Sequence, residues 1–121
     1  MSDPADLAAK VESGELRFHE LEDHADADAA AAARRLLVEE QSGASLDTVG
    51  DYSFPAEDAD HAIENMVGAA QIPMGVVGPV TVDGAARSGE TYLPLATTEG
   101  ALLASVNRGC SVIDAAGGAT A

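Results

Sequence analysis

The chain has 121 residues, with 21 acidic against six basic side chains and a formal net charge of −15 at pH 7. This charge repels nucleic-acid phosphates and anionic membranes, so we expect neither as a partner. A chain of this length builds one small core. Because aromatics make up only 3% of the residues, Leu, Val, Ile and Met must form that core.

The acidic residues are concentrated before Asn65. One interpretation is an acidic disordered segment. The other is the surface of a protein from a high-salt interior, where screening weakens the repulsion between like charges. The acids alternate with Ala and Leu at helical spacing, which a solvated tail does not need, so we favour a halophilic protein.

Several classes of protein and site are not expected. Cys110 is the only cysteine, which excludes an internal disulfide or a cysteine-based metal cluster, and the three histidines lack ligand-pair spacing, so no metal site is predicted. The N-terminus MSDPADLAAK lacks the apolar segment of a signal peptide, and no apolar run reaches the roughly 18 residues of a membrane span. We therefore expect a cytoplasmic protein.

Helical patterns dominate residues 1–63. A first helix should begin at Asp3-Pro4, a typical helix start, and end near residues 13–14. A second, stronger helix is predicted from about Asp26 to residues 42–43, with aspartates near its start that suit the helix dipole. A third short helix should follow Pro55 and run to residues 62–63. This part is therefore predicted to be a small helical N-terminal region.

β-Branched residues and glycines replace alanine in residues 64–121. The segments GVVGPVTVDG (75–84) and ETYLPL (90–95) predict a β-hairpin, with Pro79 and Pro94 at a strand edge or end because proline has no amide hydrogen. A long helix should begin at Thr97 or Thr98 and end near residues 117–118. The predicted fold class is α+β, with the hairpin and long helix beginning a larger domain.

Glu99 has two interpretations. In the first turn of a helix capped by Thr97 or Thr98, its carboxylate would simply complement the helix dipole. Alternatively, a carboxyl between Leu95 and Leu102 could be desolvated enough to carry a proton at neutral pH and act as a general acid.

The next turns also leave two possibilities open. Ser105, Asn107 and Arg108 together offer the donors that a phosphate needs, and Gly109 leaves room for close approach to the backbone. The alternative is a solvated polar face. Cys110 lies on a helical stripe with Leu102, Val106 and Ile113, which favours a core residue over a nucleophile. The glycines of residues 75–78 lack the G-x-G-x-x-G spacing of a dinucleotide loop.

Four ordered motifs resemble the 3-hydroxy-3-methylglutaryl-coenzyme A reductase family. They are ENMVG (64–68), IPMGVVGPV (72–80), LATTEGALLASVNRGCSVI (95–113) and GGATA (117–121). The resemblance implies reduction of a CoA thioester to mevalonate and CoA with two NADPH, through a hemithioacetal and mevaldehyde. It makes Glu99 the catalytic acid of the TTEG motif. It also implies CoA contacts by the following residues: Ser105, Val106, Asn107, Arg108, Gly109, Cys110 and Ser111.

The resemblance carries further expectations. Some relatives have a second arginine at the position of Ser111, and a tyrosine near the adenine where His19 aligns. The Glu64–Gly68 motif implies a homodimer with shared active sites. The family's catalytic lysine, aspartate and histidine, and its NADP-binding domain, belong beyond Ala121, so we expect an N-terminal fragment that is inactive alone. The alternative is a non-catalytic dimerisation or CoA/nucleotide-binding module that keeps the scaffold.

Overall fold

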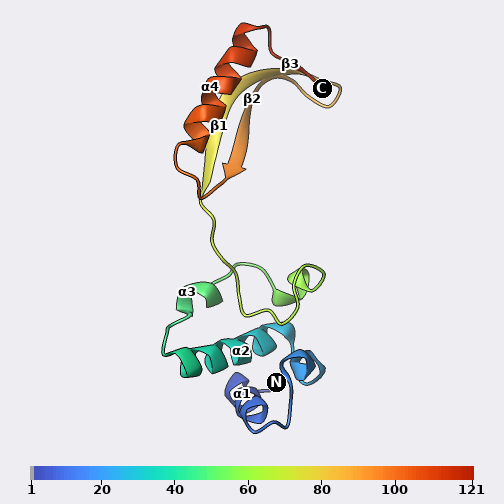
Figure 1. Cartoon of the computed structure of the whole chain (residues 1–121). Coiled ribbons are helices and arrows are strands. Elements are labelled where there is room, and N and C mark those ends of the chain that lie inside the picture. Colours follow the sequence, from blue (N-terminus) through green and yellow to red (C-terminus); the bar gives the residue numbers. More distant parts are fainter. Residues whose placement is uncertain (1) are drawn as a thin grey trace. The chain divides into compact units, whose positions relative to one another are not determined.

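The computed structural model describes residues 2–121 and divides into two compact units, Met1–Gln71 and Ile72–Ala121 (Figure 1). The first unit is helical. Its elements are α1 (Pro4–Glu12), the 3-10 helix η1 (Phe18–Asp23), α2 (Ala27–Ser42), the single turn α3 (Asp47–Gly50) and the 3-10 turn η2 (Ala56–Ala59). The helical character predicted for the N-terminal region is confirmed.

The sequence signals at the helix ends work as predicted. The Asp3 carboxylate accepts from the Ala5 amide at 3.0 Å and Pro4 fills the first position of α1. Asp26 caps α2 in the same way, accepting from the Ala29 amide at 2.8 Å. The helix ends where Gly43 takes a left-handed backbone conformation (φ 70°), which is easy for glycine.

The core of the first unit joins α1, η1 and α2. Leu7 of α1 and Leu21 of η1 pack on Ala30 and Ala33 of α2, and all four are buried. Alanines on this stripe let the neighbouring elements approach closely, which explains how a unit so poor in large apolar residues still forms a dense core.

Three short elements differ from the prediction. The 3-10 helix η1 and the single turn α3 were not expected, because each has little periodicity of its own. The third helix, expected from Pro55 to residues 62–63, is only the turn η2. Pro55 precedes that turn in extended conformation, and segment 64–71 that follows has no regular secondary structure.

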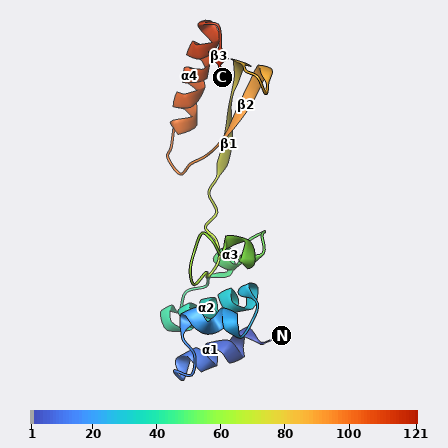
Figure 2. The same cartoon turned by 90° about the vertical axis from the view of Figure 1, so that its right-hand side faces the viewer.

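The second unit is a three-stranded sheet with one helix on it (Figures 1 and 2). Strands β1 (Met74–Asp83) and β2 (Ser88–Ala96) form the predicted antiparallel hairpin. Helix α4 (Leu102–Ala115) packs on β1, and β3 (Ala119–Thr120) then pairs parallel to β1, so the sheet order is β2-β1-β3. The predicted α+β class is confirmed.

The two strand prolines have different positions. Pro94 lies on β2, an edge strand, as predicted. Pro79 lies in the middle of β1 rather than at its end, but β3 pairs only with Val82 and Asp83, so β1 has an open edge at this proline. Pro79 is tolerated there because the register between β1 and β2 shifts between Val77 and Val80, so no regular ladder hydrogen bond is required of it.

A small apolar core lies between β1 and α4. Val77, Val80 and Cys110 are buried, with Leu103 and Val106 packed against them. The stripe on α4 therefore includes Leu103, whereas the predicted member Ile113 is 42% exposed. A Cβ added to Gly75 would lie 1.9 Å from Leu103 Cδ2, so the Leu103 side chain occupies the space that the glycine leaves open.

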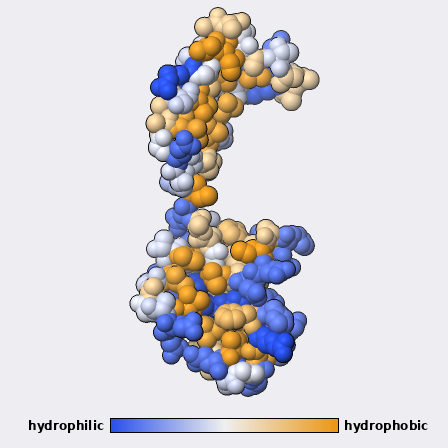
Figure 3. All heavy atoms as spheres, viewed as in Figure 1, coloured by the Kyte–Doolittle hydropathy of each residue, from blue (hydrophilic) through white to orange (hydrophobic). Residues whose placement is uncertain are grey.

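Much apolar surface of the second unit remains open (Figure 3). Met74, Val76 and Tyr92 on the strands, and Val112 on α4, are each more than 60% exposed. Among residues 2–121, no helix has the length and apolar character required to span a membrane.

Candidate functional site

The segment between β2 and α4 forms a loop rather than the start of a helix. The Thr97 hydroxyl accepts from the Glu99 amide at 2.9 Å, closing a local turn of the kind that competes with helix formation. Ala101 then adopts a left-handed conformation (φ 67°), and α4 begins only at Leu102, without a side-chain cap. The prediction of a helix starting at Thr97 or Thr98 is therefore wrong.

This correction changes the environment of Glu99. Its carboxylate lies outside the first turn of α4, so the helix dipole does not account for a carboxylate at this position. The side chain is exposed, and the described residues do not provide the apolar enclosure that was expected for it. Its role as a general acid stays a prediction.

One face of α4 is directed at the sheet. Val106 and Cys110 pack on β1. Between them, Asn107 uses its side-chain oxygen to accept from the Gly78 amide at 2.9 Å. Two turns later, Asp114 accepts from the Thr81 amide at 2.7 Å. This face therefore binds both apolar side chains and backbone amides of β1.

The opposite face of α4 presents Ser105 and Arg108. Both side chains are exposed, and the Arg108 guanidinium donates to the Ser105 hydroxyl at 3.1 Å. A Cβ added to the adjacent Gly109 would have no neighbour within 4 Å among the described residues. A guanidinium and a hydroxyl held together beside an open glycine form a suitable surface for a phosphate group.

The seven residues expected to contact CoA are thus distributed around the helix. Ser105, Arg108 and Gly109 are exposed, whereas Cys110 is buried and Val106 is half-buried. Ser111 is exposed, and its hydroxyl donates to the Asn107 carbonyl at 3.2 Å. The CoA contacts remain predictions, and the exposed members are the ones that a ligand reaches in this unit.

Asp114 was not singled out from the sequence. The nearby Thr81 hydroxyl, together with the hydrogen bond from the Thr81 amide, lowers the pKa of the Asp114 carboxyl from its ordinary value. A signal was present, because Asp114 is one of few acidic residues after Asn65. It lies seven residues after Asn107, and hence on the same side of a helix.

In the first unit, Arg34 organises segment 64–68. Its side chain is only 1% exposed and forms a two-bond ion pair with Glu22, at 2.6 Å each. It also donates to the carbonyls of Phe18 and, at 3.3 Å, Met66. The bond to Arg34 lowers the pKa of Glu22. A buried arginine in an alanine-rich helix was likewise missed from the sequence.

Arg35 extends this arrangement by donating to the Val67 carbonyl at 2.7 Å. Gly68 follows with φ 152°, and a Cβ there would lie 2.0 Å from the Val49 carbonyl oxygen. Two consecutive arginines of α2 and one crowded glycine thus fix the backbone of segment 64–68 without any regular secondary structure.

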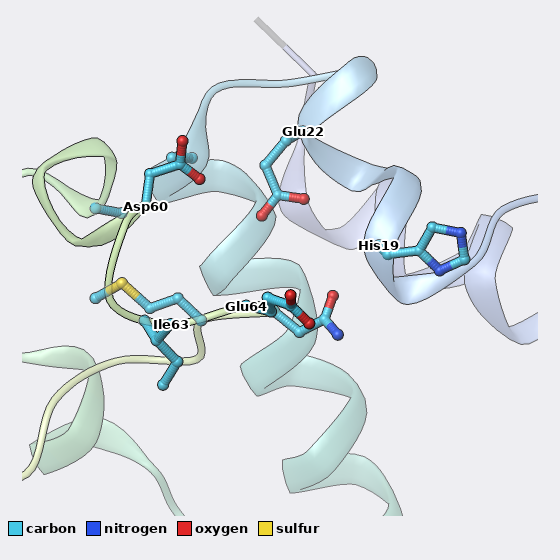
Figure 4. A pocket seen from close by; sticks show the side chains of 9 residues that line it. His19, Glu22, Asp60, Ile63 and Glu64 are labelled. Atoms are coloured by element: carbon cyan, nitrogen blue, oxygen red, sulfur yellow. The ribbon is translucent and has the colours of Figure 1, made fainter.

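The same segment borders a pocket of about 260 Å³ (Figure 4). Glu22, Asp60 and Glu64 contribute carboxylates to its wall, and His19 lies at its border. Within residues 2–121, no group of three or more His, Cys, Asp or Glu side chains is arranged to hold a metal ion.

Comparisons with known proteins agree with these motifs. The sequence profile of hydroxymethylglutaryl-coenzyme A reductase matches residues 30–121. The chain is 74% identical over its whole length to the 3-hydroxy-3-methylglutaryl-coenzyme A reductase of Haloferax volcanii. It is 58% identical, over 98% of its length, to that of Halobacterium salinarum. A rice relative, 3-hydroxy-3-methylglutaryl-coenzyme A reductase 1, is 39% identical over 94% of the chain.

The chain spans only part of these proteins, covering 30% of the length of each haloarchaeal relative and 21% of the rice protein. Within that part, the profile match includes the loop carrying Glu99, the whole of α4 and segment 64–68. The chain belongs to the hydroxymethylglutaryl-coenzyme A reductase family.

Proposed function

We propose that this chain supplies the CoA-binding helix and the acidic residue of an enzyme that reduces 3-hydroxy-3-methylglutaryl-CoA to mevalonate and CoA with two NADPH, in isoprenoid biosynthesis. The observation that carries the proposal is the exposed Ser105–Arg108 pair on α4, directly after the loop that carries Glu99. NADPH supplies hydride, and the family resemblance places its site in the part of the enzyme that this chain does not cover.

The two parts of the site have separate tasks. Arg108, with Ser105 and the open backbone at Gly109, binds the phosphates of CoA and so contributes to substrate affinity. Glu99 donates a proton to the substrate carbonyl oxygen as hydride arrives, which requires the carboxyl to be protonated and shielded from water. Glu99 is exposed in this chain. The rest of the full-length enzyme must therefore shield its carboxyl from water, and the same part must supply the catalytic lysine, aspartate and histidine.

The test measures NADPH oxidation by the full-length protein. Arg108→Ala should raise the KM for the CoA thioester about tenfold or more, since charge-assisted hydrogen bonds to phosphate contribute about 1.5–3 kcal/mol each. Glu99→Gln should lower kcat by about a hundredfold or more at unchanged KM. Arg87→Ala, which changes an exposed arginine near the hairpin turn, is the matched control.

An unchanged KM in Arg108→Ala contradicts the phosphate assignment, and an unchanged kcat in Glu99→Gln contradicts the acid assignment. The 121-residue chain alone should show no NADPH oxidation. Activity in that assay contradicts the proposed need for the catalytic lysine, aspartate and histidine of the full-length enzyme. If the full-length protein itself is inactive but binds CoA, it is a binding module instead.

We further propose that the protein is a cytoplasmic, halophilic homodimer that uses Glu64–Gly68 as a contact. The support is the fixed backbone of this segment, with Met66 and Val67 held by Arg34 and Arg35. Sedimentation equilibrium of the full-length protein tests it. Glu64→Arg should weaken the dimer while Glu57→Arg, on the turn η2, should not. Equal dimerisation of both variants contradicts the proposal.

A further inference from the structure

The edge of β1 that faces β3 is only partly covered by strand pairing. Strand β3 pairs with Val82 and Asp83 alone. On the other side, the register with β2 shifts between Val77 and Val80. On the β3 side, residues 78–81 of β1 therefore have no strand partner, although Val80 and Thr81 pair with β2 on the other side, and amides directed at this open edge need other acceptors.

Side chains of α4 supply those acceptors. Asn107 Oδ1 accepts from the Gly78 amide at 2.9 Å, and Asp114 Oδ1 accepts from the Thr81 amide at 2.7 Å. The two residues are seven apart, so they lie on the same side of α4, two turns from each other. They take the place of a neighbouring strand along this edge of β1.

Two bonds from one side of a helix fix its rotation about its own axis. With Asn107 and Asp114 bound to β1, the helical repeat places Ser105 and Arg108 on the side turned away from the sheet. Apolar packing by Val106 and Cys110 is non-directional and allows small rotations and shifts. The hydrogen bonds are directional and select one orientation.

We propose that Asp114 is a positioning residue for the phosphate-binding face of α4: its hydrogen bond to Thr81 holds the helix in the orientation in which Ser105 and Arg108 meet the CoA phosphates. This inference rests on the proposed function. Asp114 acts through Ser105 and Arg108 and touches no substrate itself. Asn107 also bonds to a β1 amide, but it is one of the expected CoA contacts. A substitution of Asp114 therefore tests the orientation of α4 without removing a CoA contact.

Loss of the bond should lower the fraction of molecules with the binding-competent orientation, and apparent affinity falls by the same factor. In the full-length protein, Asp114→Ala should raise the KM for 3-hydroxy-3-methylglutaryl-CoA about fivefold, the factor expected for one net hydrogen bond, with kcat unchanged. Asp114→Asn keeps the side-chain oxygen acceptor and should restore the original KM. Glu90→Ala removes an exposed carboxylate on β2 and serves as the control.

Two further measurements separate positioning from general damage. In an Arg108→Ala background, Asp114→Ala should raise KM by a smaller factor than in the parent, because only the Ser105 contact then depends on the orientation of α4. With the pantetheine thioester, which lacks the nucleotide phosphates of CoA, the parent and Asp114→Ala should have equal KM values. Thermal unfolding confirms that each variant is folded, and Asp114→Ser replaces Asp114→Ala should the latter not fold.

An unchanged KM in Asp114→Ala, or an equal rise with the pantetheine substrate, overturns the positioning role. Failure of Asp114→Asn to restore KM overturns it as well. These results are distinct from failure of the proposed function, which is recognised by an Arg108→Ala variant that keeps the parent KM.

Discussion

Arg34 shows how one side chain can define a region without regular secondary structure. It is buried among Glu22 and the Phe18 carbonyl, both on η1, and the Met66 carbonyl, which lies more than 40 residues further along the chain. A buried charge is tolerated only when it is fully paired, and no buried side-chain polar atom among the described residues lacks a partner. Segment 64–68 therefore depends on α2 for its shape.

Replacement of Arg34 should destabilise the first unit strongly. In Arg34→Ala, two carbonyls lose their donor while Glu22, whose side chain is 41% exposed, stays in contact with water, so we expect a loss of about 1–3 kcal/mol in the free energy of unfolding, measured by urea denaturation of the full-length protein. Arg34→Lys should recover little, because an ammonium group cannot reproduce the planar two-bond contact with Glu22. Arg17→Ala, at an exposed arginine, is the control; equal losses in both variants contradict this role.

The ion pair also predicts a pH dependence. The pKa of Glu22 is lowered in the folded protein, mainly by the hydrogen bond from Arg34. Folding is therefore stabilised above the unfolded pKa of about 4.3, and this contribution is lost as pH falls through the folded pKa. Glu22→Gln should be less stable than the parent at pH 7, and the difference should shrink below about pH 4. Urea unfolding at several pH values measures this, and a constant difference contradicts it.

At the scale of elements, the sequence predicted what local signals encode. Helices α1 and α2 have capping residues and terminating glycines, and the hairpin has alternating β-branched residues, so their positions were correct. The start of α4 was wrong because Thr97 has two possible uses, as a helix cap or as the acceptor in a local turn. Tertiary packing, which local sequence patterns do not encode, decides between the two and favours the turn.

The site was predictable to the same degree. Family motifs identified α4 and the residues on it, but not which of them face the sheet. Which α4 residues face the sheet depends on where the helix starts and on which β1 amides have no strand partner. The role of Asp114 can be inferred only when both are known. The buried Arg34 was missed for a similar reason, since its partners come from distant segments.

The contact between α4 and β1 can be tested at Gly75. A Cβ at this position would overlap the Leu103 side chain, so Gly75→Ala must displace that side chain from its packing on β1, and we expect a loss of about 1–3 kcal/mol in stability. Circular dichroism during thermal unfolding of the full-length protein measures it. Combining Gly75→Ala with Leu103→Ala should recover part of the loss, and failure to do so contradicts the overlap as its cause.

Gly109 gives the opposite expectation. It lies inside α4 with no neighbour within 4 Å among the described residues, so Gly109→Ala should stabilise the helix by up to about 1 kcal/mol. If the backbone here approaches the CoA phosphates, the same change should raise the KM for the CoA thioester. Higher stability with an unchanged KM means that no ligand comes close to this position.

For the whole molecule, the net charge of −15 governs how stability responds to salt. Like charges on the acidic first half repel over about 10 Å at 0.1 M ionic strength and over about 3 Å at 1 M. The melting temperature of the full-length protein should therefore rise between about 0.1 M and 2 M KCl. Sucrose at matched osmolality, which does not screen charges, should have a smaller effect, and equal effects contradict electrostatic screening.

The buried contacts of Arg34 also determine when the first unit can form during synthesis. Glu22 and Phe18 precede this arginine and leave the ribosome before it, but the Met66 carbonyl is made 32 residues later. Helices α1 and α2 are therefore complete while one acceptor of the guanidinium is still missing. The apolar core of α1, η1 and α2 can therefore form first, and the nascent unit reaches its final packing only after segment 64–68 has emerged.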